Sequence, residues 1–176
     1  VLLAACGGTV DRYAVPAPTT DAAMPSLSSR YATIEVRQVS LPTYAASEEI
    51  ASRSDTGAIT SNKSLLWADE PSRAMTLELA RMLGVMTRAQ VAAEPWPFLD
   101  RASAQLDVRV EEMVSDADGT FRLSGQYYVA PYSGVGGRSG LFSITTPVTG
   151  EGAGAIAAAR GAAVRQLAEQ IARQGL

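Results

Sequence analysis

Paired carboxylates are the first residues in this sequence whose types and spacing could support catalysis. Glu111 and Glu112 are adjacent, and Asp116 and Asp118 follow a few positions later. General acid–base catalysis by two carboxylates requires environments that hold their pKa values apart. The local pattern puts all four on the solvent side of a hairpin or in its turn, where water surrounds each of them alike. We therefore expect them to serve turn formation and solubility, and we predict no catalytic residue.

The sequence does not predict a metal site. Asp116-Ala117-Asp118-Gly119 begins like a calcium-binding loop, but such a loop has Glu at its twelfth position, where this chain has Tyr127. Met75, Met82 and Met86 recur at helical spacing, which is typical of a buried helix face rather than of a soft-metal site. One Cys and no His cannot supply the tetrahedral ligand set of structural zinc. We expect no metal and no non-covalent cofactor.

The lack of histidine also limits nucleophilic catalysis. Histidine is the usual general base near neutral pH, so Ser-His-Asp and Cys-His mechanisms are excluded. Ser139 lies outside any nucleophile elbow and has no His to activate it. Gly150 to Ala155 fits the G-x-G-x-x-A pattern of dinucleotide sites, but such a site needs an acidic residue at the end of a following parallel strand. Glu169 instead lies inside a predicted helix, so we expect a flexible strand-to-helix turn.

Composition narrows the class of partner. The 176 residues include 15 Lys plus Arg and 18 Asp plus Glu, which gives a formal net charge of −3, and the sequence has no basic block. Nucleic acid is therefore not expected as a partner. With 47% hydrophobic residues, a chain of this length can bury a core without disulfides or a structural metal.

The single cysteine follows a short apolar run in Leu3-Ala4-Ala5-Cys6. This segment resembles the bacterial lipobox, in which the Cys thiol is diacylated, the signal is cut before it and the new N-terminus is acylated. We expect residues 1–5 to be the remnant of a lipoprotein signal peptide and Cys6 to be the lipid attachment site of a mature chain 6–176. Three acyl chains would anchor the protein stably without spanning the membrane. A buried, unreactive Cys6 is the alternative.

Two N-terminal features refine this prediction. Gly7 stands where lipoproteins retained at the inner membrane often carry Asp, which resembles the pattern of lipoproteins sent to the outer membrane. Residues 6–30 are rich in Pro, Thr, Ser, Ala and Gly, and this composition is typical of a tether. Within it, Tyr13-Ala14-Val15 could add a short edge strand. We expect residues 31–176 to form a single globular domain.

The elements of this domain follow from hydrophobic periodicity. Alternation predicts a strand over 31–36 and a hairpin of 104–110 with 121–129, joined by the turn at 116–119. A third antiparallel strand is expected over 142–148, and shorter strands are expected over 50–53, 58–60 and 91–93.

Two amphipathic helices complete the expected domain. Pro71 opens one of them, and the other covers 154–174, with Ile156, Ala159, Ala163, Leu167 and Ile171 on one face. Each apolar stripe must be buried against another layer. The predicted class is therefore α/β (α+β): a two-layer, mixed and mostly antiparallel sheet with the two main helices packed on one face.

The ordered pieces, taken together, resemble a known family. They are the lipobox Cys6, 12–15, 34–44, 49–53, 66–71, the strand around 107–110 and the Ala-rich last helix. In this order and spacing they look like the PqiC/YmbA-type ABC-transport auxiliary lipoproteins. The resemblance covers nearly the whole chain and brings no catalytic residue with it.

This resemblance implies a function. It implies an outer-membrane lipoprotein that faces the periplasm and serves as a non-enzymatic accessory subunit of an intermembrane lipid transport system. The implied partners are a protein with mammalian-cell-entry (MCE) domains and an inner-membrane permease, and the family also suggests self-association into rings. The alternative is a periplasmic hydrolase that uses carboxylates, which would require a concave pocket with a strongly shifted Asp or Glu.

Aromatic residues beside prolines are the candidates for partner binding. Tyr44, Trp67, Trp96 and Phe98 lie near strand or helix ends, where complete burial is not forced. Loops on a rigid scaffold commonly carry binding residues, and Trp and Tyr are favoured anchors. Trp67 has a second interpretation, because a Trp just before a helix can attach that helix to the sheet.

Overall fold

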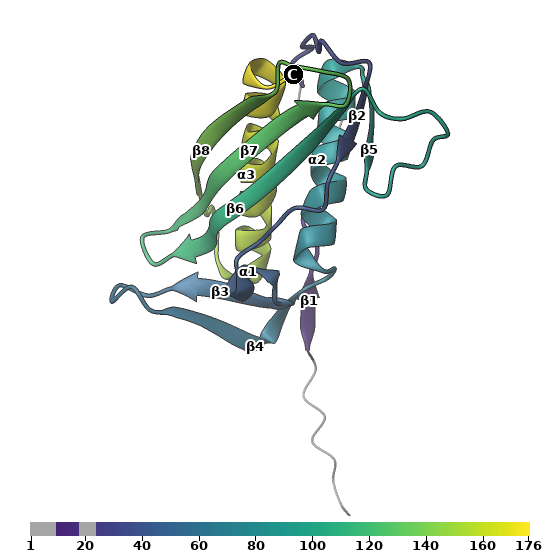
Figure 1. The fold of residues 1–176 in the computed structure, drawn as a ribbon. Coiled ribbons are helices and arrows are strands. Elements are labelled where there is room, and N and C mark those ends of the chain that lie inside the picture. The colour runs from purple at the N-terminus through teal and green to yellow at the C-terminus, as the bar shows by residue number, and fades with distance from the viewer. Residues whose placement is uncertain (1–9, 18–23) are drawn as a thin grey trace, which may run out of the picture.

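A computed structural model describes residues 10–17 and 24–176, and these residues form a mixed eight-stranded sheet with two long helices against one face (Figure 1). Along the chain the elements are β1 (Asp11–Tyr13), β2 (Thr33–Val36), α1 (Thr43–Ala46), β3 (Glu49–Arg53), β4 (Ile59–Trp67), α2 (Pro71–Thr87), β5 (Gln90–Ala93), β6 (Ala104–Asp116), β7 (Thr120–Pro131), β8 (Arg138–Pro147) and α3 (Gly152–Gln174). This α+β architecture confirms the predicted fold class.

The antiparallel meander β6–β7–β8 forms the centre of the fold. Along most of their length its strands alternate between buried and more exposed residues, as the sequence predicted. Gly119 takes the positive φ of 79° that the turn between β6 and β7 requires. At the β-bulge near Val110, a Cβ on Gly125 would lie 2.1 Å from the Arg109 carbonyl oxygen, so only glycine fits there.

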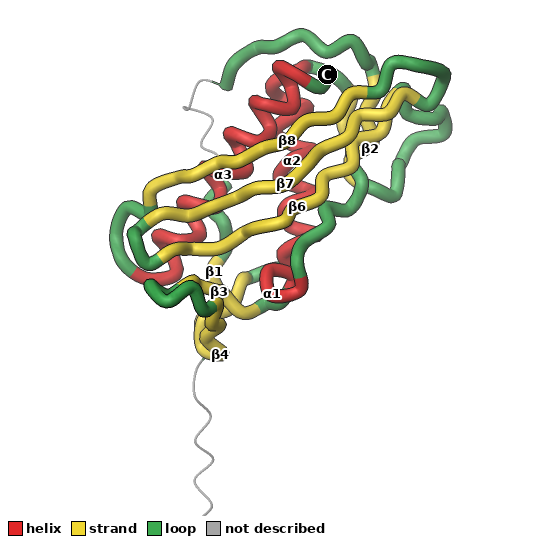
Figure 2. The backbone as a smooth tube through the Cα atoms, turned by 60° about the vertical axis from the view of Figure 1, so that its left-hand side comes forward, coloured by secondary structure: helices red, strands yellow, loops and turns green. Residues whose placement is uncertain are grey.

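One edge of β6 pairs with β7. Along its opposite edge the sheet continues as two separate groups of strands (Figure 2). At the start of β6, residues 104–106 pair in parallel with β2, and β5 pairs with β2 beyond it. At the end of β6, Ser115 and Asp116 pair in parallel with β3, and β4 and β1 follow outward. The sheet therefore has two separate outer groups, one at each end of its longest strand.

Both long helices cover the same face of the sheet, as predicted, with α3 against β7 and β8 and α2 against β2, β5 and α3 (Figure 1). Pro71 opens α2, and the Glu70 side chain accepts hydrogen bonds from the Ser72 and Arg73 amides. The buried face of α2 includes Met75, Leu79, Met82, Leu83 and Met86. The methionine stripe is therefore part of the core, as the spacing indicated.

Three elements differ from the sequence-based expectation. The loop near Pro42 contains the short helix α1. Strand β4 extends to Trp67 rather than ending at residue 60, although most of its length is exposed. The N-terminal edge strand is Asp11–Tyr13, two residues earlier than expected, and it pairs in parallel with Leu65 to Trp67.

The described parts of the expected tether pack against the domain. Tyr13 and Val15 contact a small apolar cluster, and Met24 and Leu27 pack against the main core. The Leu27 amide also donates a 2.7 Å hydrogen bond to the Met86 carbonyl. Residues 10–17 and 24–30 thus contribute to the fold. Within the described residues, no helix is long and apolar enough to cross a membrane.

Candidate functional site

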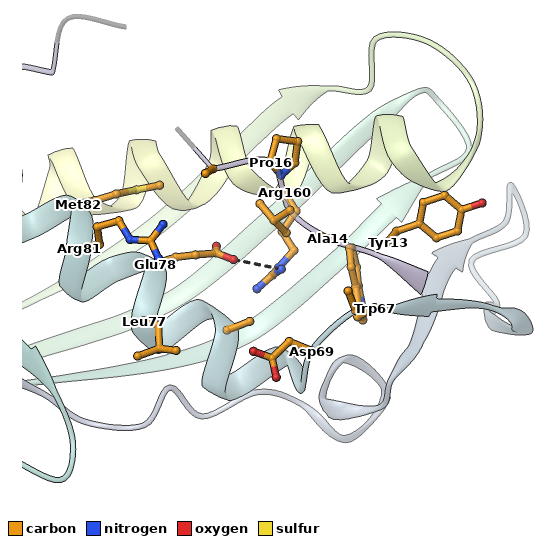
Figure 3. A pocket seen from close by; sticks show the side chains of 14 residues that line it. Tyr13, Ala14, Pro16, Trp67, Asp69, Leu77, Glu78, Arg81, Met82 and Arg160 are labelled. Carbon is orange, nitrogen blue, oxygen red and sulfur yellow. Dashed lines mark ion pairs between the residues drawn. The ribbon is translucent and has the colours of Figure 1, made fainter. Parts of the chain in front are cut away.

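A cavity of about 200 Å³ lies between α2, α3 and the N-terminal segment 13–17, which we call the N-terminal wall (Figure 3). Arg160 reaches into this region from α3, and Glu78 approaches from α2. Trp67, at the end of β4, also lines the cavity. We call this space the charged cavity, because it contains a buried ion pair in an otherwise largely apolar lining.

The ion pair joins Arg160 Nη1 to Glu78 Oε1 at 3.5 Å, a distance longer than a good charge-assisted hydrogen bond. The Arg160 side chain is only 2% exposed and that of Glu78 is 15% exposed. The guanidinium carbon of Arg160 also lies 5.1 Å from the centre of the Trp67 ring, within cation–π range. The aromatic face therefore supplies part of the environment that water would otherwise give this charge.

Burial shifts the ionisation of both partners. Loss of water lowers the pKa of Arg160, and the negative charges of Glu78 and Asp69 oppose that shift. Burial likewise raises the pKa of Glu78, against the positive charges of Arg160 and Arg81. A guanidinium gives up no proton in proteins, so this pair does not form a general acid and base. The Arg160–Glu78 pair is instead suited to binding a charged group.

Glu78 meets part of the requirement for the alternative hydrolase, because it is a carboxylate of raised pKa in a cavity. Catalysis by two carboxylates also needs a second one in a distinct environment beside it. Asp69 lines the same cavity, but it pairs with Arg73 on the exposed side of α2. Within the described part of the chain, no group of three acidic or metal-binding residues is arranged to hold a metal ion. The geometry of the cavity therefore fits binding better than hydrolysis.

Sequence reasoning missed Arg160 and Glu78. Arg160 follows Ala159, a predicted core residue, so the helical pattern alone gave no reason to bury a charge there. A usable sequence signal was the glycine at 161, because a glycine inside a helical pattern often has a packing reason. In the structure a Cβ at Gly161 would lie 2.8 Å from Val15 Cγ1. That close approach shows that the N-terminal wall packs directly against this part of α3.

The predicted carboxylate pairs lie elsewhere, around the turn between β6 and β7. Glu112 pairs with Arg53, and Asp116 pairs with Arg122. Asp118 accepts hydrogen bonds from the side chain and amide of Thr120, and the hydroxyl bond is the main reason that its pKa is lowered. The Asp116 and Asp118 contacts stabilise the hairpin, whereas the Glu112–Arg53 pair joins β6 to β3. The expectation that all four carboxylates lie in solvent is wrong for Asp116, whose side chain is only 10% exposed.

The four aromatic candidates fall into different environments. Trp67 is buried in the charged cavity, which favours its second interpretation as an attachment between helix and sheet. Tyr44 is partly buried, and its hydroxyl accepts a 3.2 Å hydrogen bond from the Met113 amide. Trp96 and Phe98 instead contact each other, with ring centres 4.9 Å apart in an edge-to-face arrangement. The structure therefore brings together only two of the four.

Trp96, Phe98 and Leu99 form what we call the aromatic tip, in the loop between β5 and β6. Phe98 is 46% exposed, Leu99 is fully exposed, and the loop borders a hollow of about 490 Å³. The Trp96 indole donates a 2.7 Å hydrogen bond to the Asp100 carbonyl, which fixes the loop. The tip lies away from β1, toward the other end of the molecule (Figure 1). Its role in partner binding stays a prediction.

Cys6 lies outside the described residues, so its acylation also stays a prediction. The comparisons with known proteins address the class of the chain instead. A family model described as "ABC-type transport auxiliary lipoprotein component" matches residues 13–172. A search of curated proteins gives no match.

Two solved structures share the fold. One, titled only as an uncharacterized protein, has a TM-score of 0.73 at 18% identity, with 92% of this chain and 97% of that chain covered. The other is protein XCC0632 from Xanthomonas campestris, of the DUF330 family, with a TM-score of 0.71 at 19% identity and 93% of each chain covered. At these identities the likeness concerns the fold.

Proposed function

The chain belongs to the family of ABC-type transport auxiliary lipoprotein components, and from that premise we propose that it is a non-enzymatic accessory subunit of an intermembrane lipid transport system. In this proposal Cys6 anchors the protein to the outer membrane, and the domain faces the periplasm. An MCE-domain protein and an inner-membrane permease are its partners. The observation that carries the proposal is the family match over residues 13–172, which includes both helices and the whole meander almost to the end of α3.

The position of β1 adds a geometric argument. Val10 is the first described residue, four positions after Cys6, and four extended residues span at most roughly 14 Å. An acylated Cys6 would therefore keep the β1 end of the domain close to the membrane surface. The effective tether is much shorter than residues 6–30, because the chain already pairs with β4 at Asp11.

The same geometry suggests what the aromatic tip contacts. The tip lies toward the end of the molecule away from β1, so a domain held at Cys6 would direct it into the periplasm rather than into its own membrane (Figure 1). Exposed Phe98 and Leu99, on a loop held by a rigid sheet, have the character of protein-binding anchors. We therefore assign the partner surface to Trp96, Phe98 and Leu99.

Copurification from crosslinked cell envelopes tests both parts of the proposal. The native protein should capture an MCE-domain protein, and the double variant Phe98→Ser/Leu99→Ser should lose most of that capture while remaining in the membrane. Leu141→Ser is the matched control, because Leu141 is 73% exposed on β8, away from the tip. Unchanged capture by the tip variant would refute the assigned surface, and capture of no transport component by the native protein would refute the function.

The anchor has a separate test. Mass spectrometry of the protein extracted from membranes of its native host should show a triacylated N-terminal Cys6. A Cys6→Ala variant should appear in the soluble periplasmic fraction, and density-gradient separation of the native protein should place it with the outer membrane. A free thiol on a soluble product would exclude lipidation, and recovery with the inner membrane would exclude the proposed sorting.

A further inference from the structure

The Arg160–Glu78 pair in the charged cavity leaves polar atoms without partners. Among the described residues, Arg160 Nε, Arg160 Nη2 and Glu78 Oε2 are buried and have no hydrogen-bond partner. Buried polar groups in folded proteins are nearly always satisfied, and an incomplete charged network is especially costly. An unsatisfied buried guanidinium beside a cavity therefore calls for a binding partner outside the described residues.

The two unpartnered nitrogens define one edge of the Arg160 guanidinium. Its Nη1 atom faces Glu78, whereas the N–H groups of Nε and Nη2 lie on the remaining edge and have no partner among the described residues. Two parallel donors in this fork are the arrangement that accepts a carboxylate or phosphate in bidentate fashion. The free edge thus has the geometry of an anion site.

The charges around the cavity are consistent with an anion. Arg160 and Arg81 both line it, and they face the single negative charge of Glu78. Asp69 also lines it, but its carboxylate is engaged by Arg73. An incoming anion would therefore restore the charge balance rather than disturb it.

The remaining lining is apolar and comes from three parts of the fold. Val15 and Pro16 belong to the N-terminal wall, Trp67 ends β4, and Leu77 and Met82 lie on α2 (Figure 3). A simple inorganic anion would leave this surface without a partner. A ligand that combines an anionic head with a short apolar part would satisfy both kinds of lining.

We propose that the charged cavity binds an anionic amphiphile, whose carboxylate or phosphate accepts hydrogen bonds from Arg160 Nε and Nη2. Its apolar part lies against Trp67, Leu77 and Met82. Since both nitrogens are buried, binding moves the N-terminal wall, which is held by the three-residue ladder of β1 with β4 and by the contact of Val15 with Gly161. The site does not require the transport partners.

A fluorescence titration tests this site on the full chain carrying Cys6→Ser, purified without detergent so that no other amphiphile competes. The chain has two tryptophans, and Trp96→Phe leaves Trp67, inside the cavity, as the reporter. Octyl phosphate and octanoate represent the two anionic heads. Octyl glucoside has the same tail without a charge, and inorganic phosphate has the charge without a tail.

We expect at least one anionic amphiphile to bind roughly tenfold or more tightly than octyl glucoside and inorganic phosphate, as the loss of a charged hydrogen bond or of apolar contact predicts. The preferred head distinguishes a phosphate from a carboxylate ligand. Arg160→Lys keeps the charge but removes the fork, so it should lose most of this preference. The double variant Glu78→Leu/Arg160→Met should lose the preference entirely while remaining folded.

Three results would overturn the proposal: no saturable binding of either anionic probe, equal binding of octyl glucoside, or an unchanged preference in Arg160→Lys. Arg81→Gln serves as the control, because Arg81 is exposed at the rim and should have a smaller effect. None of these results depends on capture of an MCE-domain protein. The ligand site and the transport function can therefore fail separately.

Discussion

The main core and the small cluster beneath the N-terminal wall are built on different principles. The main core joins β2, β6, β7 and β8 to the buried faces of α2 and α3 with almost entirely apolar side chains. The small cluster contains Ile50, Trp67, Ala153 and Ala157, with Tyr13 and Val15 packed against it, and the Arg160–Glu78 pair lies beside it. Three of the four buried side-chain atoms without a hydrogen-bond partner among the described residues belong to this pair, and the fourth is Asp116 Oδ1 at the end of β6. The two regions therefore differ in how completely their buried groups are matched, and the ligand proposed for the charged cavity would supply what the second region lacks.

The largest effect should come from the main core. Leu79 on α2 is fully buried, and Leu79→Ala should lower the free energy of unfolding by about 3–4 kcal/mol, because it removes apolar contacts and leaves a cavity. Leu77 lies on the same helix beside the charged cavity and is 39% exposed, so Leu77→Ala should cost less than about 1 kcal/mol. Urea denaturation measures both. Equal losses would remove the distinction between the two faces of α2.

The charged pair should give the next largest effect. Arg160→Met alone should destabilise the fold by roughly 2–3 kcal/mol, somewhat less than a fully buried pair, because Glu78 keeps some contact with water. The double variant Glu78→Leu/Arg160→Met should be neutral or stabilising, since it replaces an incompletely satisfied pair with apolar contacts.

A double-mutant cycle from thermal or chemical unfolding checks this expectation. If the double variant is less stable than Arg160→Met alone, then the pair is a structural requirement of the fold. The unpaired atoms of Arg160 and Glu78 would in that case not mark a ligand site.

The sequence predicted the main core well because its signals are local and repeated. In β7, Phe121, Leu123 and Tyr127 are buried on one face while their neighbours are more exposed, and this alternation is visible without knowledge of the fold. The stripe of α3 is equally regular, and Ala159, Ala163, Leu167 and Ile171 are all buried as expected. In both elements one period predicts most of the buried residues, although in α3 Ile156 is only partly buried and Arg160 is buried outside the predicted stripe.

The small cluster escaped prediction because its contacts join distant parts of the chain. The residues before Trp67 are polar and exposed and show no apolar alternation, so the sequence did not predict the full length of β4. Strand β1 pairs with β4 through only three residues. Arg160 lies outside the predicted apolar stripe of α3. It is buried because Trp67 and the N-terminal wall, which are distant in the sequence, cover it. For the aromatic candidates, the sequence could identify residue type but not whether Trp67 or Phe98 would be covered.

The contact between α3 and the N-terminal wall predicts a smaller effect. Gly154 has open space around it, so Gly154→Ala should raise the free energy of unfolding by about 0.5 kcal/mol through the lower entropy of the unfolded chain. Gly161→Ala should lose most of the same gain, because its new Cβ would lie 2.8 Å from Val15 Cγ1. The wall should shift to relieve this contact.

Trypsin cleavage after Arg12, identified by mass spectrometry, reports on the wall, because Arg12 lies in β1 and is exposed. Cleavage should be faster in Gly161→Ala than in the native protein and unchanged in Gly154→Ala. If both variants gain the same stability with the same cleavage rate, then the wall does not depend on its approach to α3, and movement of the wall would not be the route into the charged cavity.

The smallest effect is a pH dependence that the charged cavity should show and the main core should not. Burial raises the pKa of Glu78 in the folded state, so its contribution to stability is complete below the ordinary Glu pKa and is lost as the pH rises through the raised value. Arg160 and Arg81, which face it, stay charged throughout this range. The difference in free energy of unfolding between the native protein and Glu78→Gln should therefore fall from pH 4 toward pH 7. The difference between the native protein and Leu79→Ala should stay constant, because no titrating group is involved. A flat profile for Glu78→Gln would mean that water reaches this carboxylate freely, and the contrast between the two regions would then be one of size alone.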